Sequence, residues 1–176
     1  MPVSVNASDL TRLVRQLGSV ARNTPREFAQ TIASVGRASK TETKRASAAV
    51  YNAPQSRIDQ GLKVRTTTDS VLIEGKRKTL TLKSFKPRQT KKGVLVTVIK
   101  SRGRKRIKGG FSPTKFNGVP FIRLGSKRFP IAPIQGPSVA DMLNNKDVFT
   151  PLQERLVLRA RNELDRRITR ALKNRG

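Results

Sequence analysis

Gly93-Val94-Leu95-Val96-Thr97-Val98-Ile99 is the stretch that decides the fold class. Residues 94–99 are rich in β-branched side chains and follow Gly93, a residue that favours a turn. This is the pattern of a β-strand. Stretches of the same kind lie on either side of it, at residues 70–74, 79–82, 119–123 and 127–131. The last two contain prolines, which favour a sheet edge or a bulge because proline has no N–H to donate. We therefore expect an antiparallel β-sheet with long loops over residues 64–134.

Helical periodicity precedes this β region. Residues 8–23 predict a short amphipathic helix. Thr24-Pro25-Arg26-Glu27 has the pattern of a capping box and predicts the start of a second helix, which we expect to end near Asn52. The Ala, Ser and Thr residues of 38–49 would let another helix approach this one closely. Residues 55–62 predict one or two further helical turns.

Helical periodicity also follows the β region. Ser138 is expected to cap a short turn that runs to Asn145, and Thr150-Pro151-Leu152-Gln153 repeats the capping-box pattern. Beyond it, one apolar stripe contains Leu156, Ala160, Leu164, Ile168 and Leu172. We therefore predict an α+β fold in a single domain over residues 1–176. It has N-terminal helices (8–52), a central basic antiparallel β-sheet with long loops (64–134) and a C-terminal amphipathic helical region (138–174).

The composition excludes several kinds of functional site. The 176 residues include no His, no Cys and no Trp. Zinc fingers and iron–sulfur sites need Cys or His ligands, and the common catalytic triads need an imidazole or a thiol. The sequence has no G-x-x-x-x-G-K-[ST] motif and no closely paired carboxylates. We expect no cofactor or metal and no conventional enzyme, although composition alone leaves a Ser–Lys nucleophile open.

No stretch of the chain predicts a membrane segment. The longest apolar runs are a few residues, against about 18–20 needed to span a bilayer, and no segment resembles a signal peptide. The absence of Cys rules out disulfides and is typical of a reducing compartment. We therefore expect a soluble protein that does not contact membranes and is not secreted by the standard route.

The positive charge is concentrated in the middle of the chain. The formal net charge is +27, and residues 75–140 hold 18 Lys and Arg with no Asp or Glu. Self-repulsion of this size is normally offset by an anionic partner, most often nucleic acid. The alternative is a solvated surface that only keeps the protein soluble.

Nine basic residues are the candidate contacts to such a partner. They lie in segments expected to be loops between strands, where cations can reach phosphates without reading bases. They are Lys76, Arg77, Lys78, Lys100, Arg102, Arg104, Lys105, Arg106 and Lys108. Residues 101–118 are expected to form a flexible polybasic loop, with a disordered solvated loop as the alternative. The nearby Phe85, Phe111 and Phe116 are expected in the core rather than as stacking platforms.

The block from Val119 to Val139 adds a resemblance. Its distinctive residues are Lys127, Arg128, Pro130, Ile131, Gly136, Pro137 and Ser138. This block is similar to the C-terminal signature of the bacteriophage minor tail protein Z family, the tail completion proteins of long-tailed phages. The order of parts along the chain is similar as well. The sequence departs from the family pattern at Ser126, at Phe129 and at Ala140-Asp141.

The resemblance implies a structural virion protein at the head-proximal end of the tail, at the head–tail junction. It implies a homo-oligomer, a hexameric ring around the channel through which DNA passes. The implied partners are tail terminator, tail tube or neck proteins, the tape measure protein, and DNA through its backbone. The implied location is the virion, with assembly in the host cytoplasm. Pro130, Gly136 and Pro137 would then fix the turn into the C-terminal helix.

A different class of protein also fits the composition. A free, sequence-independent nucleic-acid-binding protein of the ribosomal or nucleoid type would have the same charge and the same lack of catalytic groups. An endonuclease is disfavoured because His is absent and the carboxylates that would hold Mg²⁺ are sparse.

Overall fold

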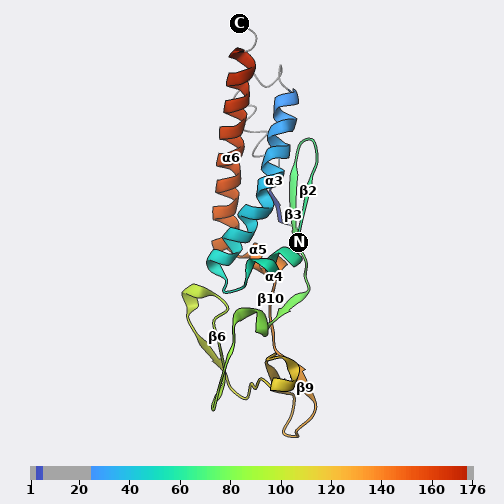
Figure 1. Cartoon of the computed structure of the whole chain (residues 1–176), viewed down its shortest axis with the longest axis vertical. Coiled ribbons are helices and arrows are strands. Elements are labelled where there is room, and N and C mark those ends of the chain that lie inside the picture. The colour runs from blue at the N-terminus through green and yellow to red at the C-terminus, as the bar shows by residue number, and fades with distance from the viewer. Residues whose placement is uncertain (1–2, 6–24, 174–176) are drawn as a thin grey trace.

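The computed structural model of the chain describes residues 3–5 and 25–173, and its fold is α+β, as the sequence predicts (Figure 1). The molecule is elongated, with a helical half at one end and a β half at the other. The helices are α3 (Pro25–Val50), α4 (Gln55–Gln60), α5 (Val139–Asn144) and α6 (Lys146–Lys173). The strands are β1 (Val3–Val5), β2 (Leu62–Thr66), β3 (Val71–Gly75), β4 (Thr79–Thr81), β5 (Arg88–Thr90), β6 (Gly93–Val96), β7 (Lys105–Ile107), β8 (Phe121–Arg123), β9 (Ile131–Pro133) and β10 (Gln135–Ser138). Three short 3-10 helices lie between strands: η1 (Leu82–Phe85), η2 (Lys100–Arg102) and η3 (Thr114–Phe116).

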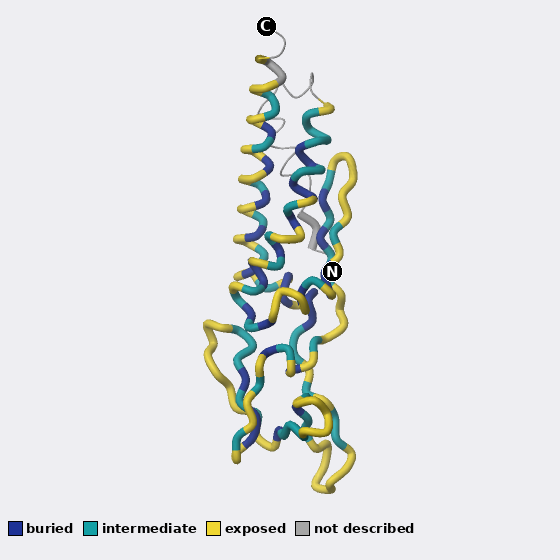
Figure 2. The backbone as a smooth tube through the Cα atoms, viewed as in Figure 1, coloured by how far each residue is buried: buried dark blue, intermediate teal, exposed yellow. Residues whose placement is uncertain are grey.

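The helical half is built on α3 and α6, which run antiparallel side by side. The apolar stripe of α6 is buried as predicted at Leu156, Ala160 and Leu164, and Ile168 is half-buried. Thr31, Ser39, Thr43 and Ser47 of α3 are buried too, and α3 packs against another helix, α6, as expected. Thr43 Oγ1 donates to the carbonyl of Ser39 at 2.7 Å, so its hydroxyl is satisfied within the helix. Figure 2 shows the buried faces of α3 and α6 turned toward each other.

The beginning of α3 at Pro25 agrees with the sequence, because proline suits the first helical position. The helix ends at Val50, before Ala53-Pro54, and α4 fills the predicted turns after it. The expected helix at 8–23 and the cap at Thr24 lie outside the described residues. None of the helices within 25–173 is long and apolar enough to cross a membrane.

The prediction that the last helix begins after a cap at Thr150 is wrong. Helix α6 begins at Lys146 and carries Pro151 inside it. The Asn145 side chain accepts from the backbone N–H of Asp147 at 3.0 Å, which provides the cap one turn earlier. Val148 in that extra turn is completely buried, so its packing favours the longer helix over the proline signal.

A three-stranded antiparallel sheet in the order β1-β3-β2 lies against α3. The sequence predicted β3 but not the strands on either side of it. Ile73 of β3 is completely buried, while β2 is mostly exposed. The alternation of Leu62 and Val64 with Lys63 and Arg65 was the available signal for β2, but residues 55–62 were expected to be helical. At Gly36 of α3 an added β-carbon would collide with the side chain of Thr66, so a glycine here lets β2 approach the helix.

The β half is antiparallel, as expected, but it is divided within the described residues into small sheets: β4 with β10, β5-β6-β7, and β8 with β9. Phe85 and Leu82 of η1 are buried, and they belong to the same core cluster as Val96 of β6 and Leu143 of α5. The strand expected at 127–131 is displaced to Ile131–Pro133, because the residues before it are exposed and no apolar face holds them in a sheet.

Candidate polyanion-binding surface

The polybasic segment expected to be a flexible loop contains a paired strand, so that prediction is wrong. Strand β7 pairs with β6 in the register Val94↔Ile107, Leu95↔Arg106 and Val96↔Lys105. Ile107 packs against the core cluster and fixes this register. The pattern Lys105-Arg106-Ile107 hides the strand because only one of its three residues is apolar. Lys105 and Arg106 are therefore held on a sheet.

The outer face of this sheet presents a row of cations. Arg88 of β5 and Arg106 of β7 both lie opposite Leu95 of β6, and residues directly opposite one another point to the same side. The other face buries Val94 and Val96. Lys91 and Lys92 are exposed in the β5–β6 turn. Arg88, Lys91 and Lys92 were not among the predicted contacts, although they belong to the same acid-free segment.

Three of the predicted cations flank strand β7: Arg102 and Arg104 come before it, and Lys108 comes after it. Arg104 is exposed just before β7, and Lys108 is exposed in the turn after it. Arg102 and Lys105 border a cavity of about 370 Å³ whose lining also includes Ile134 and Pro137. The cations of residues 100–108 thus lie on η2, on β7 and on the residues that flank them.

Lys100 has a structural role that the sequence did not reveal. Its Nζ donates to the backbone carbonyl of Ala48 at 2.5 Å, near the C-terminal end of α3. A cation at this end complements the helix dipole and satisfies a carbonyl that has no intrahelical partner. Tyr51 and Ile99 form an isolated antiparallel bridge beside it. Lys100 thus ties the β half to the helical half.

Lys76, Arg77 and Lys78 form the exposed connection between β3 and β4. Lys76 and Lys78 line a cavity of about 350 Å³ together with Arg57, Thr79 and Ser84, and no carboxylate is among its lining residues. Strand β4 borders this cavity, and its partner β10 borders the cavity of Arg102 and Lys105. The two predicted groups of cations therefore flank the same pair of strands, in separate hollows.

Ion pairs form in the helical half, at Glu42, Asp59 and Glu163, and in the β2–β3 hairpin, at Glu74. Nζ of Lys40 and Nζ of Lys44 each lie 3.1 Å from Oδ1 of Asp59, and these two ammonium groups hold the pKa of Asp59 below its usual range. Arg65 pairs with Glu74. Among the described residues, none of the 18 cations between residues 75 and 140 has a carboxylate within ion-pair distance.

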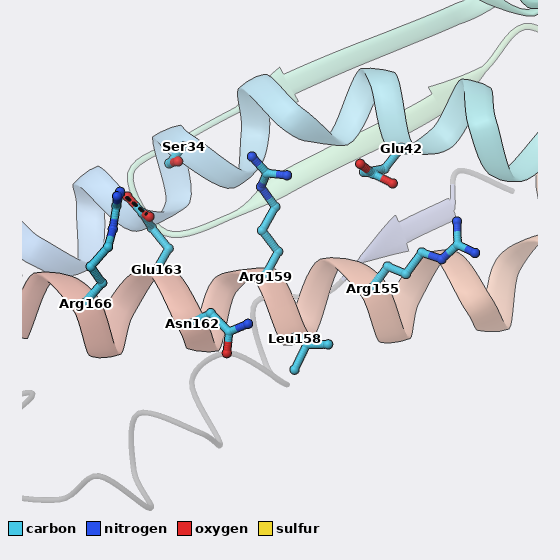
Figure 3. A pocket seen from close by; sticks show the side chains of 8 residues that line it. All are labelled: Ser34, Glu42, Arg155, Leu158, Arg159, Asn162, Glu163 and Arg166. Carbon is cyan, nitrogen blue, oxygen red and sulfur yellow. Dashed lines mark hydrogen bonds and ion pairs between the residues drawn. The ribbon is translucent and has the colours of Figure 1, made fainter.

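A cavity of about 610 Å³ between α3 and α6 provides a contrast (Figure 3). Its lining mixes Glu42 and Glu163 with three arginines. Glu163 Oε2 lies 2.6 Å from Arg166, as the dashed line shows. Burial raises the pKa of Glu163, but the hydrogen bond from Arg167 and the charges of both arginines outweigh it and lower the pKa overall. A hollow with both signs of charge has no preference for anions.

The residues that carry the family resemblance divide into two groups. Lys127, Arg128 and Pro130 lie exposed on the β8–β9 loop, and Ile131 begins β9. Gly136 and Pro137 lie in β10, which leads directly into α5. Ser138 caps α5 as predicted: its Oγ accepts from the N–H of Asp141 at 3.1 Å, and Asp141 Oδ2 accepts from the N–H of Ser138 at 2.9 Å.

The phenylalanines of the β half differ in their surroundings. Phe85 is completely buried, as expected. Phe116 is exposed and Phe111 half-buried, so the prediction that these two lie in the core is wrong. Phe129, one of the departures from the family pattern, is exposed beside Arg128. A polar, glycine-rich neighbourhood at residues 109–118 and 125–126 was the available signal that these rings lack a core to enter.

Within residues 3–5 and 25–173, no group of three or more carboxylates gathers in a way that could hold a metal ion. No protein-family model, no curated protein and no solved structure matches the chain.

Proposed function

We propose that this chain is a structural, non-catalytic assembly protein whose β half faces a polyanion. The observation that carries the proposal is the separation of charge along the molecule. Four carboxylates of the helical half and the β2–β3 hairpin, Glu42, Asp59, Glu74 and Glu163, pair with cations of the same part of the chain, whereas the 18 cations of residues 75–140 have no ion-pair partner among the described residues. The mutual repulsion of these 18 cations opposes a compact fold, and a partner that supplies the opposite charge would offset it.

We propose further that the assembly is a phage tail and that the chain completes its head-proximal end. Support for this step comes from the resemblance of residues 119–139 to the minor tail protein Z family. A homohexameric ring would multiply the charge of +27 per chain into a positive annulus. Such an annulus suits a DNA end held by its backbone, or the acidic surface of a tape measure or tail tube protein.

If the polyanion is a nucleic acid, contact to it would not depend on its base sequence. The cations lie on short strands, 3-10 helices and turns, and no long helix among the described residues 75–138 is available to enter a major groove. Lys and Arg on such elements contact phosphates, and that contribution is independent of the bases and weakens steeply with salt. A free nucleic-acid-binding protein would contact phosphates in the same way. The two candidate functions, tail component and free nucleic-acid-binding protein, are therefore distinguished by whether the chain associates with copies of itself.

Light scattering of the purified full chain tests the assembly. At about 1 M salt, where screening reduces the Debye length to about 3 Å, a ring component is expected to form one closed oligomer or to bind isolated tails. Binding to a duplex at low salt, measured in parallel, tests the polyanion contact. If the chain stays monomeric, does not bind isolated tails and binds duplex only at low salt, the result would favour the function of a free nucleic-acid-binding protein. A chain that binds no polyanion would overturn both.

A further inference from the structure

Exposed apolar side chains gather at the far end of the β half. Phe116 is 46% exposed, Leu124 66% and Phe129 63%. Together with Leu158 on α6, they are the large hydrophobic residues that the described part of the chain leaves exposed. Three of four at one end form a patch on an otherwise strongly charged surface, and such a patch marks an interaction site.

The patch is supported from beneath by an ordered cluster of rings. Phe111 and Phe121 exchange two backbone hydrogen bonds, of 2.9 and 2.7 Å. The ring of Phe121 lies 5.1 Å from that of Phe116 and 6.4 Å from that of Phe111, measured between centroids. These contacts hold the ring of Phe116 in place while much of it stays exposed.

Every charged side chain at the patch is positive. A hollow of about 420 Å³ lies among the three rings of Phe111, Phe116 and Phe129 and the three cations Lys115, Arg123 and Arg128. The guanidinium carbon of Arg123 lies 4.8 Å from the ring centroid of Phe111, and that of Arg128 lies 5.8 Å from that of Phe129. A guanidinium over a ring keeps its N–H groups free to donate at the edge.

The combination selects one class of partner. Exposed rings between cations suit a ligand that has flat apolar faces and a negative backbone, and an unpaired nucleic-acid strand has both. A duplex conceals the faces of its bases in its own stack, and an acidic peptide has no regular flat faces to offer. We propose that this patch binds unpaired nucleotides, with bases stacked on Phe116 and Phe129 and phosphates at Lys115, Arg123 and Arg128. This inference rests on the proposed polyanion contact and deepens it by naming the class of strand.

The affinities of four ligands of equal length for the purified full chain test the inference. Each affinity is measured by fluorescence, either directly with a labelled ligand or by competition with one. The ligands are oligo-dT, an abasic oligonucleotide with the same phosphates, a duplex, and a polyglutamate peptide. Removing the bases is expected to weaken binding by about five- to 150-fold, the equivalent of stacking a single base. The abasic strand isolates stacking because its charge is unchanged.

A pair of variants tests the residues. Phe116→Leu with Phe129→Leu keeps apolar bulk but removes the aromatic faces, and the preference for oligo-dT over the abasic strand is expected to disappear. Leu158→Ala, an equally exposed site on α6, is expected to keep the preference. Circular dichroism confirms that each variant is folded.

The outcomes separate this inference from the proposed function. Equal affinity for the abasic strand and oligo-dT, with duplex binding retained, would overturn the stacking site and leave the polyanion contact standing. Tighter binding of polyglutamate than of oligo-dT would also overturn it, in favour of an acidic protein partner. Failure to bind any of the four would overturn the proposed polyanion contact itself.

Discussion

Gly136 lies directly against the ring of Phe85, so that a β-carbon added to the glycine would be 2.6 Å from Cε2 of that ring. Phe85 is completely buried and belongs to the core cluster that continues into the helical half. The close approach therefore anchors β10, and with it the start of α5, on the core. This gives a packing role to the glycine of the block that resembles the phage family.

Replacing Gly136 with alanine is expected to destabilise the protein by about 1–3 kcal/mol, because the new methyl group has to displace a buried ring. Urea unfolding followed by circular dichroism measures the change. Gly125→Ala is the matched control, since nothing lies within 4 Å of its added β-carbon. Equal effects at the two positions would contradict the packing role.

Lys100 and Arg104 are expected to respond differently although both are exposed cations. Lys100→Met removes the donor to the Ala48 carbonyl and is expected to cost about 0.3–1 kcal/mol of stability. Arg104 holds no backbone carbonyl in this way within the described part of the chain, so Arg104→Met is expected to weaken polyanion binding and leave stability unchanged. Thermal unfolding and duplex titration of both variants check the assignment, which an effect of Arg104→Met on stability would contradict.

Neutralising Arg104, Lys105 and Arg106 to Gln is expected to weaken duplex binding while leaving the fold intact. For each phosphate that the variant no longer neutralises, the negative slope of log K against log salt should become shallower by about 0.9. Fluorescence titrations at several salt concentrations measure that slope. The same change at Arg155, Arg159 and Arg161, three exposed cations of α6, is the control. An equally shallower slope for the control variant would show that the whole surface binds, rather than the β half.

Leu156 and Leu158 lie two residues apart on α6 and face opposite environments, at 2% and 59% exposed. Leu156→Asp places a charge in the α3–α6 core and is expected to cost about 3 kcal/mol or more. Leu158→Asp is expected to change stability by less than about 0.5 kcal/mol. Denaturant unfolding of the two variants measures the difference, and comparable losses of stability would show that α6 does not bury the predicted stripe.

Asp141 links stability to pH. The hydrogen bond from the Ser138 side chain, followed by that from its backbone N–H, holds the pKa of Asp141 below its usual range. A carboxyl whose pKa is lower in the folded protein stabilises it above the ordinary aspartate pKa of about 3.9, and this contribution is lost as the pH falls through the folded pKa. Asp141→Asn is expected to cost about 0.5–2 kcal/mol at pH 7, in the range of helix-cap changes.

The cost of Asp141→Asn is expected to shrink as the pH falls, because the wild-type carboxyl then loses its charge as well. Unfolding of the two proteins between pH 7 and the lowest pH at which both still fold provides the check. A cost that stays constant over the whole range would mean that the charge of Asp141 is not part of the cap.

Local signals predicted the elements that depend on local chemistry. Pro25 begins α3 and Ser138 caps α5, since each needs only its immediate neighbours. The β-branched run at 93–99 predicted β6 for the same reason. Helix α6 starts earlier than its proline indicates because Val148 packs against residues distant in the sequence, which no local pattern reveals.

Strand β7 and the exposed rings show the same limit for the candidate site. Lys105 and Arg106 lie in a strand because β6 offers it a partner and Ile107 a place in the core, and both contributions come from outside the segment. Composition located the acid-free cations without the structure, but it could not show that Lys100 contacts Ala48 or that Phe116 and Phe129 lie at one end of the molecule.

The molecule is elongated, and the acid-free segment with its 18 cations lies in the β half, at one end (Figure 1). This placement affects how the molecule is oriented as it approaches a polyanion. Such a chain carries a large lengthwise dipole, and the field of a negatively charged partner exerts a torque on it before the surfaces touch. We expect the molecule to turn end-on during diffusion toward such a partner, so that encounters begin with the β half leading and the α3–α6 pair trailing. Orientation of this kind narrows the search for a productive encounter and would fade as added salt shortens the reach of the field.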